Sequence, residues 1–178
     1  MAREISRTDR GLGRRCLTWP SLSSSTTENP SGRNCRRQAL FAAGHEVGCH
    51  TYEHVSTLTL SPKGLDASLA RNAAWVAERL DGHQMRTFAY PFGDCALGAK
   101  SVIDRRFLCG RGVRDGINSG RADRNLLQAI GLESRRLPGY DLEKLVHDTA
   151  ETNGWLIAYG HDVSGSPTPY GCRPEDID

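Results

Sequence analysis

Short apolar segments alternate with helical segments from residue 46 onward, and this alternation restricts the possible folds more than any other feature. Four stretches are predicted strands, at residues 46–49, 87–90, 107–110 and 155–159. Predicted helices lie between them, one after Ser61-Pro62, one over residues 97–106 and one that ends at Asn153-Gly154. Such alternation is typical of a parallel α/β sheet or (β/α) barrel. The last strand is almost entirely apolar, which indicates burial on both faces.

The helix after Ser61 has the clearest periodicity in the chain. Ser61 is a predicted N-cap, and Pro62 suits the first helical position because it lacks a backbone N–H. The apolar residues behind it recur every three or four positions and define one face of the helix: Leu65, Leu69, Ala73, Val76 and Leu80.

Composition excludes several classes of protein. The chain has 178 residues, which is enough for one domain, and its 25% charged and 38% hydrophobic residues are typical of a globular protein. A formal net charge of +2 gives no support for nucleic-acid binding, and no apolar run is long enough for a membrane span. The chain has no secretory signal, and its six cysteines are scattered, so we expect reduced thiols and a cytoplasmic location. The oligomeric state stays open.

Residues 1–37 differ from the rest of the chain. They contain eight arginines, three acidic residues and a Ser/Thr-rich run, and their few apolar residues follow no period. We therefore predict a disordered or non-native segment at 1–37, followed by one domain at 38–178. An arginine-rich arm that binds polyanions is the functional alternative for this segment.

His50 and His54 are the first candidate site residues. Two imidazoles four residues apart can bind one metal ion, commonly zinc, on a helical turn or a loop. Unrelated histidines also meet this spacing by chance. The position of His50 directly after a predicted strand favours the metal site.

A second candidate segment runs from Arg86 to Gly93. Its strand ends at Tyr90-Pro91, where α/β enzymes place their sites, at the carboxyl edge of the sheet. A backbone N–H there can stabilise an oxyanion, and Arg86 can hold a carboxylate. The alternative is a strand that stops at a proline and carries a surface arginine.

His161 follows the last predicted strand and therefore lies at the same edge. Imidazole titrates near neutrality and can donate a proton to a leaving group. A purely structural histidine at the end of a strand is the alternative.

Taken in order, these three segments resemble motifs of the polysaccharide deacetylase family, which is carbohydrate esterase family four with the NodB-homology domain. His50-Thr51-x-x-His54 is similar to its His-Ser/Thr-x-x-His metal motif. The segment from Arg86 to Gly93 is similar to Arg-x-x-x-Tyr-Pro-x-Gly, and Ile157-x-Tyr159-x-His161 is similar to the final motif. The resemblance extends from residue 38 to the end of the chain.

The resemblance implies a distorted (β/α) barrel and metal-assisted removal of acetyl groups from a carbohydrate. It implies zinc or another divalent metal at His50 and His54, and His161 as the proton donor to the leaving amine. By the same resemblance, the N–H of Tyr90 would stabilise the oxyanion and Arg86 would orient an aspartate base. Three residues would then form the substrate pocket: Pro91, Ile157 and Tyr159.

One motif of the family is missing. The family's Asp-Asp motif supplies the base and the third metal ligand, but no Asp-Asp pair occurs in the chain. Asp9 is the only aspartate before His50, and no apolar strand precedes it. We therefore expect an incomplete barrel with a truncated or altered upstream region and weakened metal binding. Two functions remain open: a metal-dependent carbohydrate deacetylase, or an inactive relative that binds metal or sugar or is a gene fragment.

Overall fold

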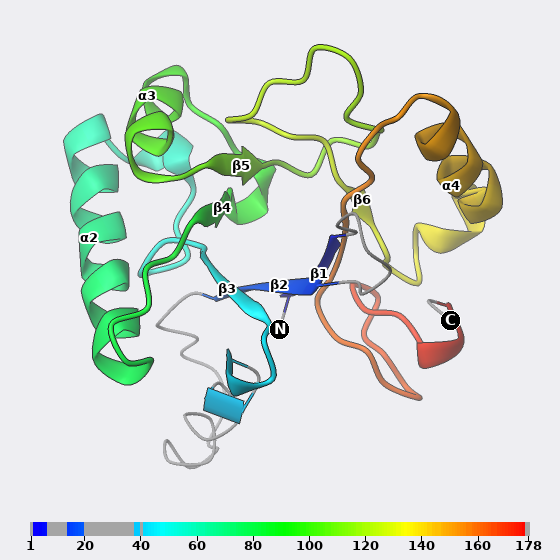
Figure 1. Cartoon of the computed structure of the whole chain (residues 1–178), viewed down its shortest axis with the longest axis horizontal. Helices are drawn as coiled ribbons and strands as arrows, with labels where there is room; N and C mark the ends of the chain where they lie inside the picture. Colours follow the sequence, from blue (N-terminus) through cyan, green and yellow to red (C-terminus); the bar gives the residue numbers. More distant parts are fainter. Residues whose placement is uncertain (1, 7–13, 20–37, 40, 177–178) are drawn as a thin grey trace.

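The computed structural model describes residues 2–6, 14–19, 38–39 and 41–176, and its centre is one strongly curved seven-stranded sheet (Figure 1). The strands follow the order β5-β4-β3-β2-β1-β7-β6. Their bounds are Ala2–Ser6 for β1, Arg14–Trp19 for β2, Glu46–Cys49 for β3, Thr87–Ala89 for β4, Cys109–Arg111 for β5, Ile130–Gly131 for β6 and Ala158–Gly160 for β7.

All strands except β1 run in the same direction. Strands β2 to β5 pair in parallel, as do β6 and β7, whereas β1 is antiparallel to both of its neighbours, β2 and β7. The carboxyl ends of β3, β4, β5 and β7 therefore meet at one edge of the sheet. This edge is where side chains from distant parts of the sequence can come together.

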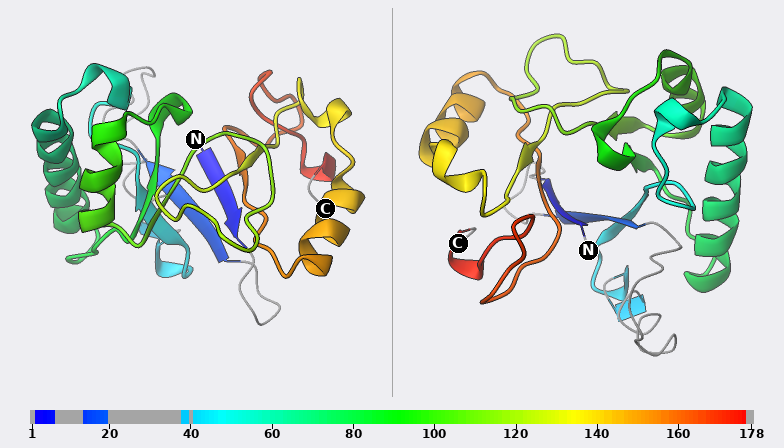
Figure 2. Two further views of the ribbon diagram at one scale, coloured as in Figure 1. Left: turned by 90° about the horizontal axis from the view of Figure 1, so that it is seen from above. Right: turned by 180° about the vertical axis from the view of Figure 1, so that it is seen from behind.

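The sheet does not close into a barrel, which confirms the predicted α/β fold with an incomplete barrel. Strands β5 and β6 are its two edges, and a single parallel bridge between Arg111 and Leu127 connects β5 to the segment that leads into β6. Helices α2 (Pro62–Arg79) and α3 (Leu97–Arg106) lie on one side of the molecule, and α4 (Leu142–Glu151) lies on the other (Figure 2). No helix in the described part of the chain is both long and apolar enough to cross a membrane.

Helix α2 begins where the sequence predicts. The Ser61 side chain accepts a hydrogen bond from the Gly64 N–H, and Pro62 occupies the first turn. Four of the five residues of the predicted apolar face are buried, namely Leu65, Leu69, Val76 and Leu80, while Ala73 is exposed. These side chains join Phe88, Val102 and Ile103 in the largest apolar cluster of the described residues. The cluster fixes the strands that carry the candidate site.

Part of the segment predicted to be disordered forms strands. Strands β1 and β2 lie within residues 1–37, and β2 pairs with β3 from Cys16↔Glu46 to Trp19↔Cys49. The apolar pattern did not indicate them, because backbone hydrogen bonds to neighbouring strands order a segment whatever its side chains. The remaining residues of 1–37, including Asp9, lie outside the described part of the chain. The boundary at residue 38 stays a prediction.

Candidate functional site

Three histidines from two strand ends lie at the carboxyl edge of the sheet. His50 follows β3 directly, His54 is four residues further along the same loop, and His161 follows β7 directly. The rings of His50 and His54 form an edge-to-face pair with centroids 4.8 Å apart. His161 is close enough for its charge to depress the pKa of both other histidines. The structure therefore brings together the three imidazoles that the sequence singled out.

His50 is held as a neutral imidazole. Its Nδ1 lies 2.7 Å from the Ala89 carbonyl oxygen, which can only accept, so Nδ1 carries the proton and Nε2 carries the lone pair. The side chain is buried, and burial is the main reason why its pKa falls to about 3, with a further contribution from the Arg111 charge. Burial and then the charge of His161 also lower the pKa of half-buried His54.

The backbone around the two histidines is conformationally unusual. Thr51, His54 and Phe92 have φ angles of 61°, 54° and 59°, in the left-handed region that residues with side chains rarely adopt. The Phe92 ring packs edge-to-face on His54, with centroids 4.7 Å apart, yet this Phe remains 63% exposed. Backbone strain of this kind concentrates at functional sites. The strain at Thr51 and Phe92 marks this edge as a site in addition to the histidines themselves.

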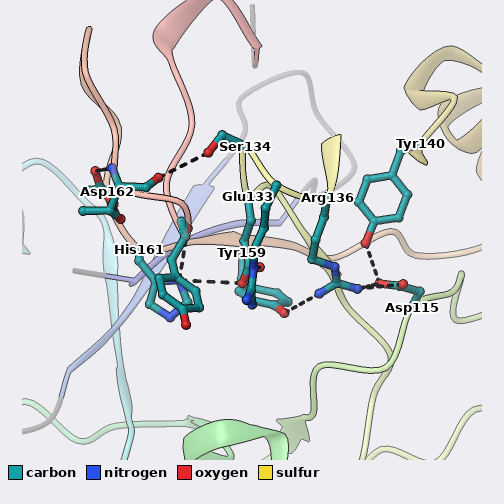
Figure 3. A network of polar contacts seen from close by, with 11 residues as sticks. Asp115, Glu133, Ser134, Arg136, Tyr140, Tyr159, His161 and Asp162 are labelled. Atoms are coloured by element: carbon teal, nitrogen blue, oxygen red, sulfur yellow. Dashed lines mark hydrogen bonds and ion pairs between the residues drawn. The ribbon is translucent and has the colours of Figure 1, made fainter. Parts of the chain in front are cut away.

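His161 is anchored from its Nδ1 side. Nδ1 lies 3.2 Å from the Tyr170 carbonyl oxygen, so it donates a proton there, and Nε2 takes no part in this contact. The buried carboxylate of Glu133 lies 4.0 Å from the same nitrogen (Figure 3). It also lies 2.8 Å from Nε of Arg135. These contacts orient the imidazole.

Tyr159, a predicted pocket residue, is held by two arginines. The Arg136 guanidinium donates to its hydroxyl at 2.9 Å and binds both carboxylate oxygens of Asp115, as Figure 3 shows. Arg111 lies over the Tyr159 ring, 4.9 Å from the centroid. The other two predicted pocket residues, Pro91 and Ile157, are buried, and Ile157 packs beside Tyr159 in the core. These residues form fixed walls, and their part in substrate binding stays a prediction.

The oxyanion role predicted for Tyr90 does not fit the structure. The backbone N–H of Tyr90 donates to the Arg111 carbonyl at 3.0 Å, because the ladder between β4 and β5 continues one residue past β4. This N–H is therefore engaged in the sheet. Since Pro91 has no N–H, the next backbone donor along the chain at this edge belongs to Phe92.

The structure does not bring Arg86 to the histidines. Arg86 is exposed and precedes β4, whereas Tyr90 follows it. Four residues of extended chain separate the two positions by roughly 13 Å, at about 3.3 Å per residue. Sequence spacing suggested a shared site, but the strand places the arginine at the opposite, amino end.

The described residues do not by themselves fit a divalent metal. His50 and His54 offer neutral imidazole ligands, but no group of three or more His, Cys, Asp and Glu side chains in the described part of the chain is placed to hold an ion. Strand β2 ends beside β3 and contains no Asp or Glu among Arg14–Trp19. Structural and catalytic zinc sites use at least three protein ligands. The described residues alone therefore do not form a complete metal site.

Sequence reasoning missed three residues at this edge: Arg111, Glu133 and the exposed Phe92. Arg111 ends β5, so its place follows once β5 is known to be parallel to β4. Glu133 lies just after β6, a two-residue strand that no apolar pattern in the sequence predicts. Phe92 belonged to a segment that the sequence did single out, but nothing in the sequence indicated its left-handed backbone.

The sequence itself matches a known family over part of its length. Residues 20–105 match the family model described as polysaccharide deacetylase. The match includes His50, His54 and Pro91 and ends before His161. It begins inside the segment that we predicted to be disordered or non-native. A search of curated proteins found no match.

Solved structures with the same fold include two related proteins. One is the Streptococcus pyogenes deacetylase PplD in complex with acetate, with 18% identity and a TM-score of 0.50 over 55% of this chain and 43% of that one. The other is IcaB from Ammonifex degensii, with 21% identity and a TM-score of 0.52 over 59% of this chain and 49% of that one. This chain therefore spans less than half of the length of these structures. At such identities, the likeness establishes the fold.

Proposed function

We propose that this chain, whose residues 20–105 match the polysaccharide deacetylase model, is a member of that family, and that its histidine edge binds an acetylated carbohydrate and hydrolyses the acetyl group slowly. The observation that carries the proposal is the convergence of His50, His54 and His161 on one strained edge of the sheet. A divalent metal is the cofactor that the family generally uses. The imidazoles of His50 and His54 would supply part of the site for such a metal.

Each group at the edge has a role in this proposal. His161, anchored through Nδ1, takes a proton at Nε2 from the water that attacks the acetyl carbon and passes it to the leaving nitrogen as the C–N bond breaks and acetate is released. The Phe92 N–H is the backbone donor nearest to the end of β4 and supports the oxyanion. The exposed Phe92 ring gives the sugar an apolar face to pack on.

Slow hydrolysis follows from what the described residues lack. The carboxylate of Glu53, in the loop after β3, is engaged by Arg71 and Ser68, and no Asp or Glu lies among Arg14–Trp19 of β2 to act as a base toward water. The described residues also offer an incomplete set of metal ligands. Removing members of a catalytic group that act together lowers turnover by several orders of magnitude. The second candidate function is therefore binding without turnover, and the incomplete ligand set favours it directly.

Two measurements on the same samples test the proposal. We expect an N-acetylglucosamine oligomer to bind, measured by calorimetry, and acetate release to be slow. His161→Ala should abolish release while binding persists. His147→Ala, at an exposed position of α4, is the control and should change neither. Binding without any release would favour the second candidate, and failure to bind the oligomer would refute the proposal.

A further inference from the structure

We propose that the cavity beside the histidine edge binds a carboxylate-bearing sugar, next to the residue that carries the acetyl group. The inference rests on the proposed function and extends it to the class of glycan. The cavity has a volume of about 500 Å³ and lies between Gly93 and the segment of residues 112–128. This volume falls within the range of sites that bind small molecules.

The position of the cavity connects it to the candidate site. Gly93 comes two residues after Pro91 at the end of β4, and Gly112 follows β5 directly, so both lie at the carboxyl edge. A Cβ atom on Gly93 would lie 2.2 Å from Cγ2 of Val113, which shows how closely the two walls approach. A glycan that packs on Phe92 can therefore continue into this cavity within one or two sugar units.

The charges that line the cavity favour an anion. Arg114 and Arg121 both line it and are exposed, and neither side chain forms an ion pair or hydrogen bond with another residue that the structure describes. One carboxylate, that of Asp123, also lines the cavity, but it pairs with Lys100. The carboxylate of Asp115, outside the lining, is held by Arg136 and Tyr140. Two guanidinium groups thus remain to pair with a carboxylate, for which their planar donor geometry is well suited.

The remaining walls suit a sugar ring more than a small free ion. Val113, Ile117 and Leu126 contribute apolar surface on which the C–H face of a pyranose can pack. Asn118 forms a rigid polar wall, since its amide donates to the Gln128 and Trp155 carbonyls and accepts from the Gln128 N–H. A mixed cavity with fixed polar walls and two arginines is typical of a site for an acidic sugar.

The test compares two N-acetylated oligosaccharides of equal length. One is the neutral N-acetylglucosamine oligomer, and the other alternates N-acetylglucosamine with glucuronate. Calorimetry at low salt should show the acidic oligomer binding about tenfold more tightly, with the preference reduced at high salt. The double variant Arg114→Gln/Arg121→Gln should bind both oligomers with the affinity of the unchanged protein for the neutral one.

A matched control separates local from general charge effects. Arg105→Gln removes one exposed arginine of α3 that does not line the cavity, so the preference for the acidic oligomer should persist. Equal affinity for the two oligomers, or a preference that survives in the double variant, would overturn the acidic subsite and leave the proposed function standing. Absence of binding by both oligomers would overturn the proposed function and the subsite together.

Discussion

Acid should destabilise the metal-free protein through His50, and the structure gives the size of the effect. Burial, and then the charges of Arg111, His54 and His161, lower the pKa of His50 from 6.5 to about 3 in the folded protein. In the unfolded chain the same imidazole takes up a proton near pH 6.5. The stabilising contribution of neutral His50 is therefore complete above pH 6.5 and is lost as the pH falls toward 3.

The magnitude follows from proton linkage. Between pH 8 and pH 5 the unfolded chain gains almost one proton at this position, while the folded protein gains almost none. Each pH unit in which this difference is complete changes the free energy of unfolding by about 1.4 kcal/mol, so the loss by pH 5 amounts to about 2 kcal/mol.

The matched variant is His50→Asn, because an asparagine amide can still donate to the Ala89 carbonyl but does not titrate. Urea unfolding with a chelator at pH 8 and pH 5 should show that the unchanged protein loses about 2 kcal/mol more than the variant. The NMR signals of the His50 ring should stay those of neutral imidazole at pH 5. Equal losses in the two proteins, or a protonated ring at pH 5, would refute the assignment of His50 as a buried neutral histidine.

Two further substitutions test the packing that supports the site. Gly93→Ala should lower the free energy of unfolding by about 2–4 kcal/mol, because it adds the strain of a positive φ to a clash with Val113. Gly120→Ala, with open space around it, should lower it by only about 1 kcal/mol. Leu69→Ala should lower the free energy of unfolding by about 2–5 kcal/mol, because Leu69 lies in the largest core cluster. Leu97→Ala, at a position 94% exposed, should change it by no more than about 0.5 kcal/mol. Urea unfolding of all four variants checks both pairs. A Gly120→Ala cost equal to that of Gly93→Ala, or equal costs at the two leucines, would contradict the packing described.

Local chemistry made much of the fold predictable. Strand β3 and helix α3 have the predicted bounds, and α2 begins at the predicted cap, because Ser61, Pro62 and a periodic apolar face all act within one helical turn of each other. Strands β1, β2 and β6 were missed. Their order comes from backbone pairing with partners far away in the sequence, and their own side chains follow no strong pattern. Strand β7 begins three residues after the start of the predicted apolar run.

The candidate site was predictable only in part, for a related reason. A histidine that directly follows a strand can be placed from the sequence, because parallel strands end at the same edge, and this holds for His50 and His161. Whether a single backbone N–H is free to bind a ligand cannot be predicted from the sequence in this way. Whether the Tyr90 N–H is free depends on how far the ladder to Arg111 extends, and whether Arg86 reaches the site depends on which end of β4 it occupies.

The left-handed backbone at Thr51, His54 and Phe92 has a consequence for anyone who engineers this protein. Glycine at His54 or Phe92 would relieve roughly 1 kcal/mol of conformational energy, so screens for thermostability should select it, whereas glycine at the fully buried Thr51 would also leave a cavity. The same replacements would remove one ring of the metal-type pair or the exposed aromatic platform, and they would loosen the loop that aims the imidazoles. Thermostability and ligand recognition therefore compete at His54 and Phe92. Variant libraries meant to recover activity should keep the native residues at these positions.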